Sequence, residues 1–316
     1  MTRRNRRSTF HSARWLLAAA VVAAVAAHAG PAAAQACCVG GALVSPVRLA
    51  PPDDYAVGLQ TRVRGDMGSF GADGGYASAS TEQDVEQDLA ASFRITRRGQ
   101  AGVVLPYVET RRIQSGGDSW GSGLGDISLN ARYDFVYAAE GPGLWPGFGL
   151  LASVLFPTGK AAGDGTNPAS TDATGTGTFN ASLGIDLEKA HGPLYVALDA
   201  WVTYCGSRSV NTPAGNLTTT FPLQWTVLAI GGYVFENEAA VALYVNFLDR
   251  GDDAINGMNQ PGTVLRLTTA GLTGIWPLTA DWRLQGTVFS DLPIDSFGRN
   301  EQAGAGGTVT LVRAWR

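Results

Sequence analysis

Hydrophobic and polar side chains alternate, residue by residue, along segments that recur through most of this chain. In residues 124–137 the odd positions from 127 onward are Ile, Leu, Ala, Tyr, Phe and Tyr, and the even positions from 126 to 134 are Asp, Ser, Asn, Arg and Asp. Segments 55–65, 85–96 and 179–188 repeat this pattern. Alternation with period two over such lengths is expected for a β-strand with one face in lipid and the other in water. The pattern therefore predicts membrane-spanning strands.

The connections between these segments alternate in length along the chain. Long polar loops are predicted at 66–82, 113–123, 157–177, 206–217, 250–262 and 291–304, and short turns at 97–99, 138–144, 189–192, 236–238 and 277–280. Successive connections of a meander lie at opposite ends of the sheet, and outer-membrane barrels have short periplasmic turns and long extracellular loops. We therefore predict an all-β fold, a transmembrane antiparallel up-and-down β-barrel of about 12 strands with both termini on the periplasmic side.

A soluble β-sandwich would show the same alternation, because its strands are also buried on one face. Two features favour the membrane barrel. The strands are expected to have about 10–14 residues, whereas strands of globular proteins mostly have 5–6. Aromatic residues also gather near both strand ends, as in the interfacial girdles of membrane barrels. Those beside the short turns are Tyr55, Phe135, Tyr137, Phe148, Tyr233, Phe235, Trp276, Trp282 and Trp315, and those towards the long loops are Phe156, Phe179, Tyr204, Phe221, Phe247 and Phe289.

The N-terminal residues have the composition of an export signal. Five arginines precede an apolar core at 15–27, and Ala32-Ala33-Ala34 follows as a small-residue cleavage pattern. The core is too short to span a membrane as a helix, which takes about 20 residues. We predict a signal peptide at 1–34, a periplasmic N-terminal tail or partial plug at 35–54, and the transmembrane β-barrel at 55–316. The expected location is the outer membrane of a Gram-negative cell, reached by way of a cleaved signal peptide.

Removal of this signal changes the charge balance. The whole chain has 23 Lys and Arg residues against 27 Asp and Glu residues, and the signal contains five of the arginines and none of the acids. The remaining acidic excess, without a basic cluster, argues against nucleic acid as a partner. The three cysteines, Cys37, Cys38 and Cys205, are too few for a disulfide framework. Since Cys205 is expected at the long-loop end and the other two in the tail, we expect unpaired or vicinally oxidised thiols.

Short Gly and Pro motifs at the strand ends resemble those of a known family. Over residues 101–187 the chain resembles the outer-membrane β-barrel family of transporters of the meta-cleavage pathway of phenol degradation. The resemblance implies an outer-membrane barrel associated with uptake of small, often aromatic compounds, and it brings no catalytic residues. The motifs are Leu105-Pro106-Tyr107, Gly123-Leu124-Gly125-Asp126, Phe156-Pro157-Thr158-Gly159 and Gly175-Thr176-Gly177.

Charged and polar residues on the polar strand faces are candidates to line the lumen. Twelve strands give a backbone radius of about 12 Å, which inward side chains reduce to a free radius of about 4–6 Å, enough for a sugar or a single-ring aromatic compound. Opposed acids and bases would create a transverse field that sets charge preference. Alternatively, they pair into a network that fills and rigidifies the lumen. The candidates are Arg62, Arg64, Asp88, Arg94, Asp126, Asn130, Arg132, Asp134, Asp186, Glu188, Asp199, Arg266 and Arg283.

One short motif resembles a catalytic sequence. Residues 117–121 match the G-x-S-x-G pattern of serine hydrolases, which needs a strand-to-helix elbow and a histidine within reach. Here the motif lies in a predicted Gly-rich loop, and His191 lies in a short turn at the opposite end. We therefore predict that the protein is not an enzyme, and we expect no cofactor and no metal site. Calcium held by the acidic residues at 249–253 is a less favoured alternative.

These features favour an outer-membrane channel or transporter for passive passage of small solutes, with amphipathic or aromatic compounds as candidates. The alternative is a non-conducting structural or surface-interaction barrel whose lumen is blocked by its own charges and tail. The two differ in whether the tail at 35–54 and the loop at 157–177 enter the lumen. The expected partners are outer-membrane lipid and lipopolysaccharide, small-molecule solutes and the barrel assembly machinery, with no nucleic acid.

Overall fold

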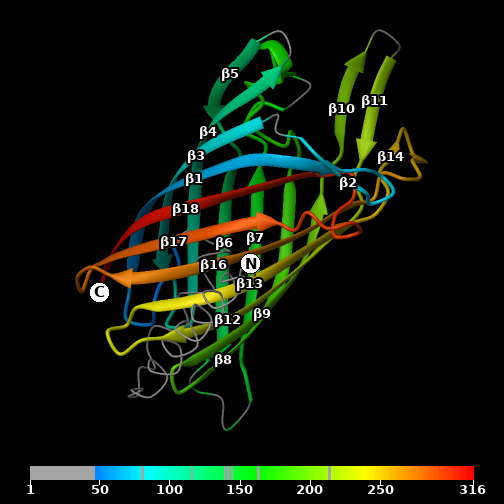
Figure 1. The fold of residues 1–316 in the computed structure, drawn as a ribbon. Coiled ribbons are helices and arrows are strands. Elements are labelled where there is room, and N and C mark those ends of the chain that lie inside the picture. Colours follow the sequence, from blue (N-terminus) through cyan, green and yellow to red (C-terminus); the bar gives the residue numbers. More distant parts are fainter. Residues whose placement is uncertain are drawn as a thin grey trace, which may run out of the picture.

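The computed structural model describes residues 47–79, 82–114, 117–138, 140, 143, 145–161, 164–212 and 215–316. Twelve strands follow one another as neighbours in an antiparallel sheet, which closes where the last strand pairs with the first. The predicted up-and-down barrel is therefore confirmed (Figure 1). Its strands are β1 (Tyr55–Phe70), β3 (Glu82–Arg94), β4 (Gly99–Gln114), β6 (Ile127–Val136), β7 (Gly147–Phe156), β8 (Asn180–His191), β9 (Leu194–Cys205), β12 (Gln224–Val234), β13 (Ala240–Arg250), β16 (Leu265–Pro277), β17 (Trp282–Asp291) and β18 (Gln302–Trp315).

The seam between β1 and β18 turns the sheet into a barrel. Its register runs from Tyr55 opposite Trp315 to Ser69 opposite Gln302, with one irregularity between Asp66 and Gly68. Closure pairs the two strands that would otherwise be edges, which is what a sheet needs in a medium that offers no hydrogen bonds. Both ends of the barrel segment of the chain lie at the end of the short turns, where β1 begins and β18 finishes (Figure 1).

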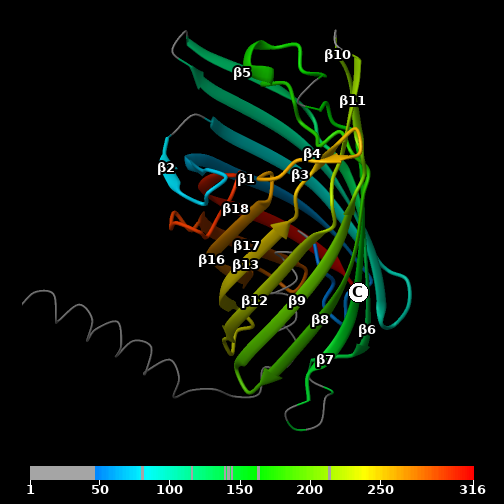
Figure 2. The same ribbon diagram turned by 90° about the vertical axis from the view of Figure 1, so that its right-hand side faces the viewer.

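The long connections contain structure of their own. The predicted loop at 113–123 is instead largely strand, because β4 continues to Gln114 and pairs with β5 as a hairpin. The predicted loop at 206–217 likewise contains a hairpin of β10 and β11. Pairing within the loop satisfies backbone groups that would otherwise need water. Both hairpins project beyond the barrel at one end (Figures 1 and 2). The short elements are β2 (Tyr76–Ser78), β5 (Gly117–Leu124), η2 (Pro168–Ser170), β10 (Arg208–Thr212), β11 (Gly215–Thr220), β14 (Ala254–Ile255) and β15 (Met258–Asn259).

Burial along the strands is inverted relative to a soluble protein. Outward Leu59 and Val288 are 57% and 60% exposed, whereas inward Asp88 is 2% exposed. A barrel whose outer face contacts lipid requires this distribution, with apolar residues outside and polar ones inside. Among the described residues there is no helix that is both long and apolar enough to cross a membrane.

Aromatic residues gather on the outer face near the strand ends. Tyr55 stacks on Trp315 across the seam, with 4.9 Å between ring centroids, and Phe135 stacks on Phe148. Phe289 differs from the expected belts, because it shares the inward parity of Arg283 and the other odd positions of β17. Its inward position matters for the lumen described next.

Candidate functional site in the barrel lumen

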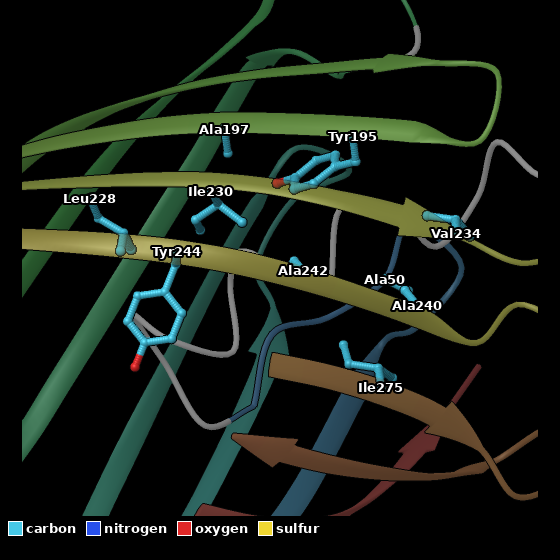
Figure 3. Close-up of a cluster of buried hydrophobic side chains, with 10 residues drawn as sticks. All are labelled: Ala50, Tyr195, Ala197, Leu228, Ile230, Val234, Ala240, Ala242, Tyr244 and Ile275. Atoms are coloured by element: carbon cyan, nitrogen blue, oxygen red, sulfur yellow. The ribbon is translucent and has the colours of Figure 1, made fainter. Parts of the chain in front are cut away.

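Residues 47–54, which precede β1, lie against the inner face of the barrel at the short-turn end. Val47 and Leu49 pack with Ala56 and other inward residues of β1, β3 and β18. Ala50 packs with inward residues of β9, β12, β13 and β16, as Figure 3 shows. Since these two sets of strands belong to different parts of the wall, this segment bridges the lumen. We call residues 47–54 the plug. The predicted signal peptide, Cys37, Cys38 and the start of the predicted tail lie outside the described residues.

Buried polar contacts hold the backbone of the plug. Ser92 donates a hydrogen bond to the carbonyl of Val47 at 2.6 Å, and the amide of Leu49 donates to the Gln100 side chain at 2.9 Å. Arg94 donates to the carbonyls of Ala50 and Asp53, at 2.6 and 2.7 Å. Backbone groups in this part of the lumen are therefore satisfied by the barrel wall, as burial requires.

Two ion pairs fix the side chains of the plug. Arg48 pairs with Glu188, which also accepts a hydrogen bond from the Tyr195 hydroxyl at 2.9 Å. Asp53 pairs with Arg283, and both side chains are almost fully buried. Buried charges are tolerated when they are paired and hydrogen-bonded, so each of these residues depends on its partner.

A cluster of carboxyl groups surrounds Arg132 beside the plug. Arg132 donates to Asp134 at 2.7 Å, pairs with Asp186, and lies 3.4 Å from Glu188. Asp186 stands directly opposite Asp199 in the register of β8 and β9. Acids outnumber bases in this cluster, which makes Arg132 its central stabilising charge. We call these residues, together with Arg48, the charge cluster.

Charges further from the plug are also paired with each other. Arg62 pairs with Glu86 on β3, and Arg64 lies 3.2 Å from Asp291 on β17. Asp88 accepts a hydrogen bond from Gln60 at 2.7 Å. Arg62 and Arg64 thus pair with acids on other strands, which favours the network interpretation over two opposed walls of fixed charge.

Arg266 is a predicted lumen residue that lies elsewhere, and Asp126 is one that holds a loop. Arg266 stands opposite Asp249, contacts it at 2.8 Å, and lies over the outward ring of Phe247. Arg266 therefore belongs to the outer face at the long-loop end, because the inward parity of β16 falls on the odd positions such as Thr269. Asp126 lies before β6 and anchors the loop 157–179 through the amides of Gly159 and Thr176, at 2.9 and 2.6 Å.

The loop 157–179 packs on the β4–β5 hairpin. The Ser119 and Thr171 hydroxyl groups lie 3.2 Å apart, and the Asn167 amide donates to the carbonyl of Trp120 at 3.2 Å. A side chain at Gly121 would come within 2.4 Å of the Thr171 backbone, so only glycine fits there. This contact gives the G-x-S-x-G motif a packing role, and His191 ends β8 at the opposite end of the barrel.

Two cavities lie in the lumen on the long-loop side of the charge cluster. One has a volume of about 380 Å³ and is lined by residues that include Asn130, Trp201 and Asn246. The other has about 450 Å³ and is lined by residues that include Arg62 and Phe289. Tyr244 and Thr269 line both, so the two spaces adjoin. The lumen therefore contains room for small solutes beyond the plug.

Sequence reasoning missed several residues that shape this site. Arg48 and Asp53 lie in a segment without strand periodicity, where the sequence gives no partner for them. Trp201 and Tyr244 were detectable in principle, since Trp201 shares the strand parity of the predicted lumen residue Asp199. Aromatic residues in a membrane barrel are usually assigned to its outer belts, so aromatic residues that face the lumen are easily overlooked.

Comparisons with known proteins address the fold. No family model matches the sequence, and no curated protein matches it, so the resemblance to the phenol meta-cleavage family stays a prediction. The structure is similar to that of the COG4313 outer membrane channel from Pseudomonas putida F1, with a TM-score of 0.68, 17% identity, and coverage of 84% of this chain and 96% of that chain. At this identity the similarity shows the outer-membrane barrel fold.

Weaker similarities involve other outer-membrane barrels. The β domain of the Bordetella autotransporter BrkA gives a TM-score of 0.47 at 12% identity, covering 83% of this chain and 100% of that chain. The TodX deltaS2S3 mutant monoaromatic hydrocarbon channel gives 0.41 at 12% identity, covering 83% and 90%.

Proposed function

We propose that the protein is an outer-membrane channel for passive passage of small solutes. The observation that carries this proposal is the pair of adjoining lumen cavities, about 380 and 450 Å³, inside a closed barrel with an apolar outer face. Such a barrel presents lipid with hydrocarbon and solutes with polar groups. The fold shared with the COG4313 outer membrane channel supports the same conclusion.

The location and partners follow from the same proposal. The chain is exported by a cleaved signal peptide, inserted by the barrel assembly machinery, and surrounded by outer-membrane lipid and lipopolysaccharide. The short-turn end faces the periplasm and the long loops face the outside, as in other barrels of this kind. Amphipathic or aromatic compounds are the solutes that the phenol meta-cleavage resemblance implies.

A non-conducting structural barrel is the second candidate, and the plug favours it. Two buried ion pairs and four hydrogen bonds with side chains of the barrel wall hold residues 47–54 across the short-turn end, where they narrow the exit from the cavities. In the channel proposal the plug is the constriction that limits flow. In the structural alternative it closes the lumen completely.

Single-channel recording in planar bilayers separates these two functions. The wild-type protein is expected to give discrete conductance steps, and Asp53→Asn is expected to give larger ones, because it removes the carboxylate that pairs with Arg283. Asp54→Asn is the matched control, since Asp54 is the next residue and is exposed. If neither the wild type nor Asp53→Asn conducts, the structural alternative replaces the channel.

A further inference from the structure

The 380 Å³ cavity differs from the rest of the lumen in having a neutral lining. All ten lining residues are uncharged: two asparagines, five serines or threonines, Trp201, Tyr244 and Leu228. We call this space the neutral chamber. Its charged neighbours lie in the charge cluster on one side and in the Arg62–Glu86 and Arg64–Asp291 pairs on the other, where Asp291 accepts a hydrogen bond from the Thr269 hydroxyl at 2.5 Å. A solute in the chamber therefore meets hydroxyl and amide groups together with aromatic rings.

The two aromatic rings of the chamber are held close to its wall by glycines on neighbouring strands. A side chain at Gly184 would come within 2.7 Å of the Trp201 ring, and one at Gly271 within 2.6 Å of the Tyr244 ring. Each ring thus lies over a glycine and occupies the space that a side chain would need. A ring that packs along a wall presents a face to the lumen and leaves the centre open. Figure 3 shows Tyr244 on the inner face of β13.

The arrangement suits one class of solute. Flat aromatic faces attract the apolar face of another ring, and convergent hydroxyl and amide groups hydrogen-bond its edge. Seven neutral hydrogen-bonding side chains line the chamber besides the Tyr244 hydroxyl. Ser182 and Thr203 bond each other and Thr269 bonds Asp291, which still leaves more groups than a single phenolic hydroxyl could use. The volume exceeds the roughly 150 Å³ that holds a benzene ring. A charged solute would find no counter-ion among the residues that line the chamber.

We propose that the neutral chamber binds a neutral six-membered ring with several hydroxyl groups, as in a monosaccharide. This inference rests on the proposed function only for the route by which the solute enters. The ring stacks on Trp201 and Tyr244, and the asparagines and hydroxyl side chains bond its hydroxyl groups. Recognition of several hydroxyl groups rather than one distinguishes this ligand from a simple phenol.

Equilibrium binding to the full-length protein in detergent tests the inference without requiring passage through the plug. Calorimetry or saturation-transfer NMR would use glucose, phenol and glucuronate as probes. We expect glucose to bind more tightly than either of the others. Trp201→Leu should weaken glucose binding about fivefold, which corresponds to about 1 kcal/mol for one aromatic contact.

A matched control exists on the adjacent strand. Trp225 stands beside Trp201 in the register, opposite Val202, but faces outward and is 58% exposed. Trp225→Leu should leave glucose affinity unchanged. Asn246→Ala gives a second test if Trp201→Leu fails to fold, and it should weaken glucose binding while leaving phenol binding unaffected.

The outcomes separate this inference from the channel proposal. Glucose binding that depends on Trp201 or Asn246, in a protein that shows no conductance, would support the chamber inference and contradict the channel proposal. Conductance in a protein whose glucose binding is unchanged by both substitutions would support the channel and overturn the chamber inference. Phenol binding tighter than glucose and lost in Trp201→Leu would overturn the inference in favour of an aromatic solute.

Discussion

Polar side chains are buried in one half of the lumen and partly exposed to cavities in the other. At the short-turn end the plug fills the space, and the side chains of Glu188 and Asp186 are 5% and 2% exposed and paired with arginines. In the long-loop half the cavities remain, and Arg62 keeps a side chain that is 39% exposed. Both halves share the same strands and the same outer wall. The inner side chains and the preceding segment, rather than barrel closure, therefore decide where the lumen is open.

The charge cluster offers the largest test of this contrast. Arg132→Ser should lower the free energy of unfolding by about 3–5 kcal/mol, because it leaves buried carboxylates without their central base. Arg62→Ser should cost about 0–1 kcal/mol, since that pair is half-exposed to the cavity. Denaturant unfolding of the protein in detergent or lipid vesicles measures both values. Equal losses in the two variants would show that the two halves do not differ in solvation.

The shared outer wall gives the second prediction. Leu129 faces outward and is 46% exposed, and its neighbour Asn130 lines the neutral chamber. Leu129→Arg should destabilise the folded barrel by about 2–4 kcal/mol, the penalty for a charge in lipid near the membrane midplane. Asn130→Arg should cost much less, because the cavity supplies water for the charge. Folding yield and unfolding in vesicles provide the measurement, and the opposite order would mean that the faces of β6 are exchanged.

The sequence predicts the barrel well because two independent patterns agree. Period-two alternation assigns the faces of strands such as β6, and alternating loop lengths assign the ends. Residues with special surroundings are where this reasoning fails. Arg266 has a charged side chain on an outward position at the long-loop end of β16, where it pairs with Asp249.

The plug was harder to predict than the strands. Its contacts join positions far apart in sequence, such as Arg48 with Glu188, and no local pattern encodes them. An indirect signal was present, because inward positions near the short turns are apolar, as at Ala56, Val312 and Ala314. An apolar inner face in a barrel needs something apolar to cover it. The tail before β1 is the nearest segment that can do so.

A pair of carboxyl groups in the charge cluster gives the third prediction. Asp186 and Asp199 stand opposite each other, but it is Asp186 that pairs with Arg132. Asp199→Asn should leave stability unchanged or raise it slightly, since an amide donor to Asp186 takes the place of the proton that two facing carboxyl groups must share. Asp186→Asn should lower the free energy of unfolding by about 1–3 kcal/mol, because Arg132 loses a charged partner. A larger loss of stability in Asp199→Asn than in Asp186→Asn would show that the cluster depends on Asp199 rather than on Asp186.

The smallest predicted effect concerns the far end of the molecule, where loop 157–179 is held by local contacts. The Lys160 ammonium donates a hydrogen bond to Asp172 at 2.6 Å, and the Thr166 amide donates another at 2.9 Å. Together they hold the pKa of Asp172 below its ordinary value of 3.8. A carboxyl group whose pKa is lowered by folding stabilises the folded loop above its ordinary pKa, and the effect is lost as the pH falls through the folded value.

The hydrogen-exchange protection factors of the loop amides should therefore stay constant from neutral pH down to the ordinary pKa of 3.8 and fall only below it. Lys160→Met removes the main cause of the lowered pKa, so exchange at Thr166 and Asn167 should accelerate at a higher pH than in the wild type. Lys189→Met serves as the control, because Lys189 lies near the last residue of β8, at the short-turn end of the barrel. If Lys160→Met leaves the pH at which protection is lost unchanged, then the amides of Thr166 and Asn167 and the Thr166 hydroxyl hold Asp172 without Lys160. The long-loop end would then resemble the plug, where backbone contacts with the wall complement the ion pairs.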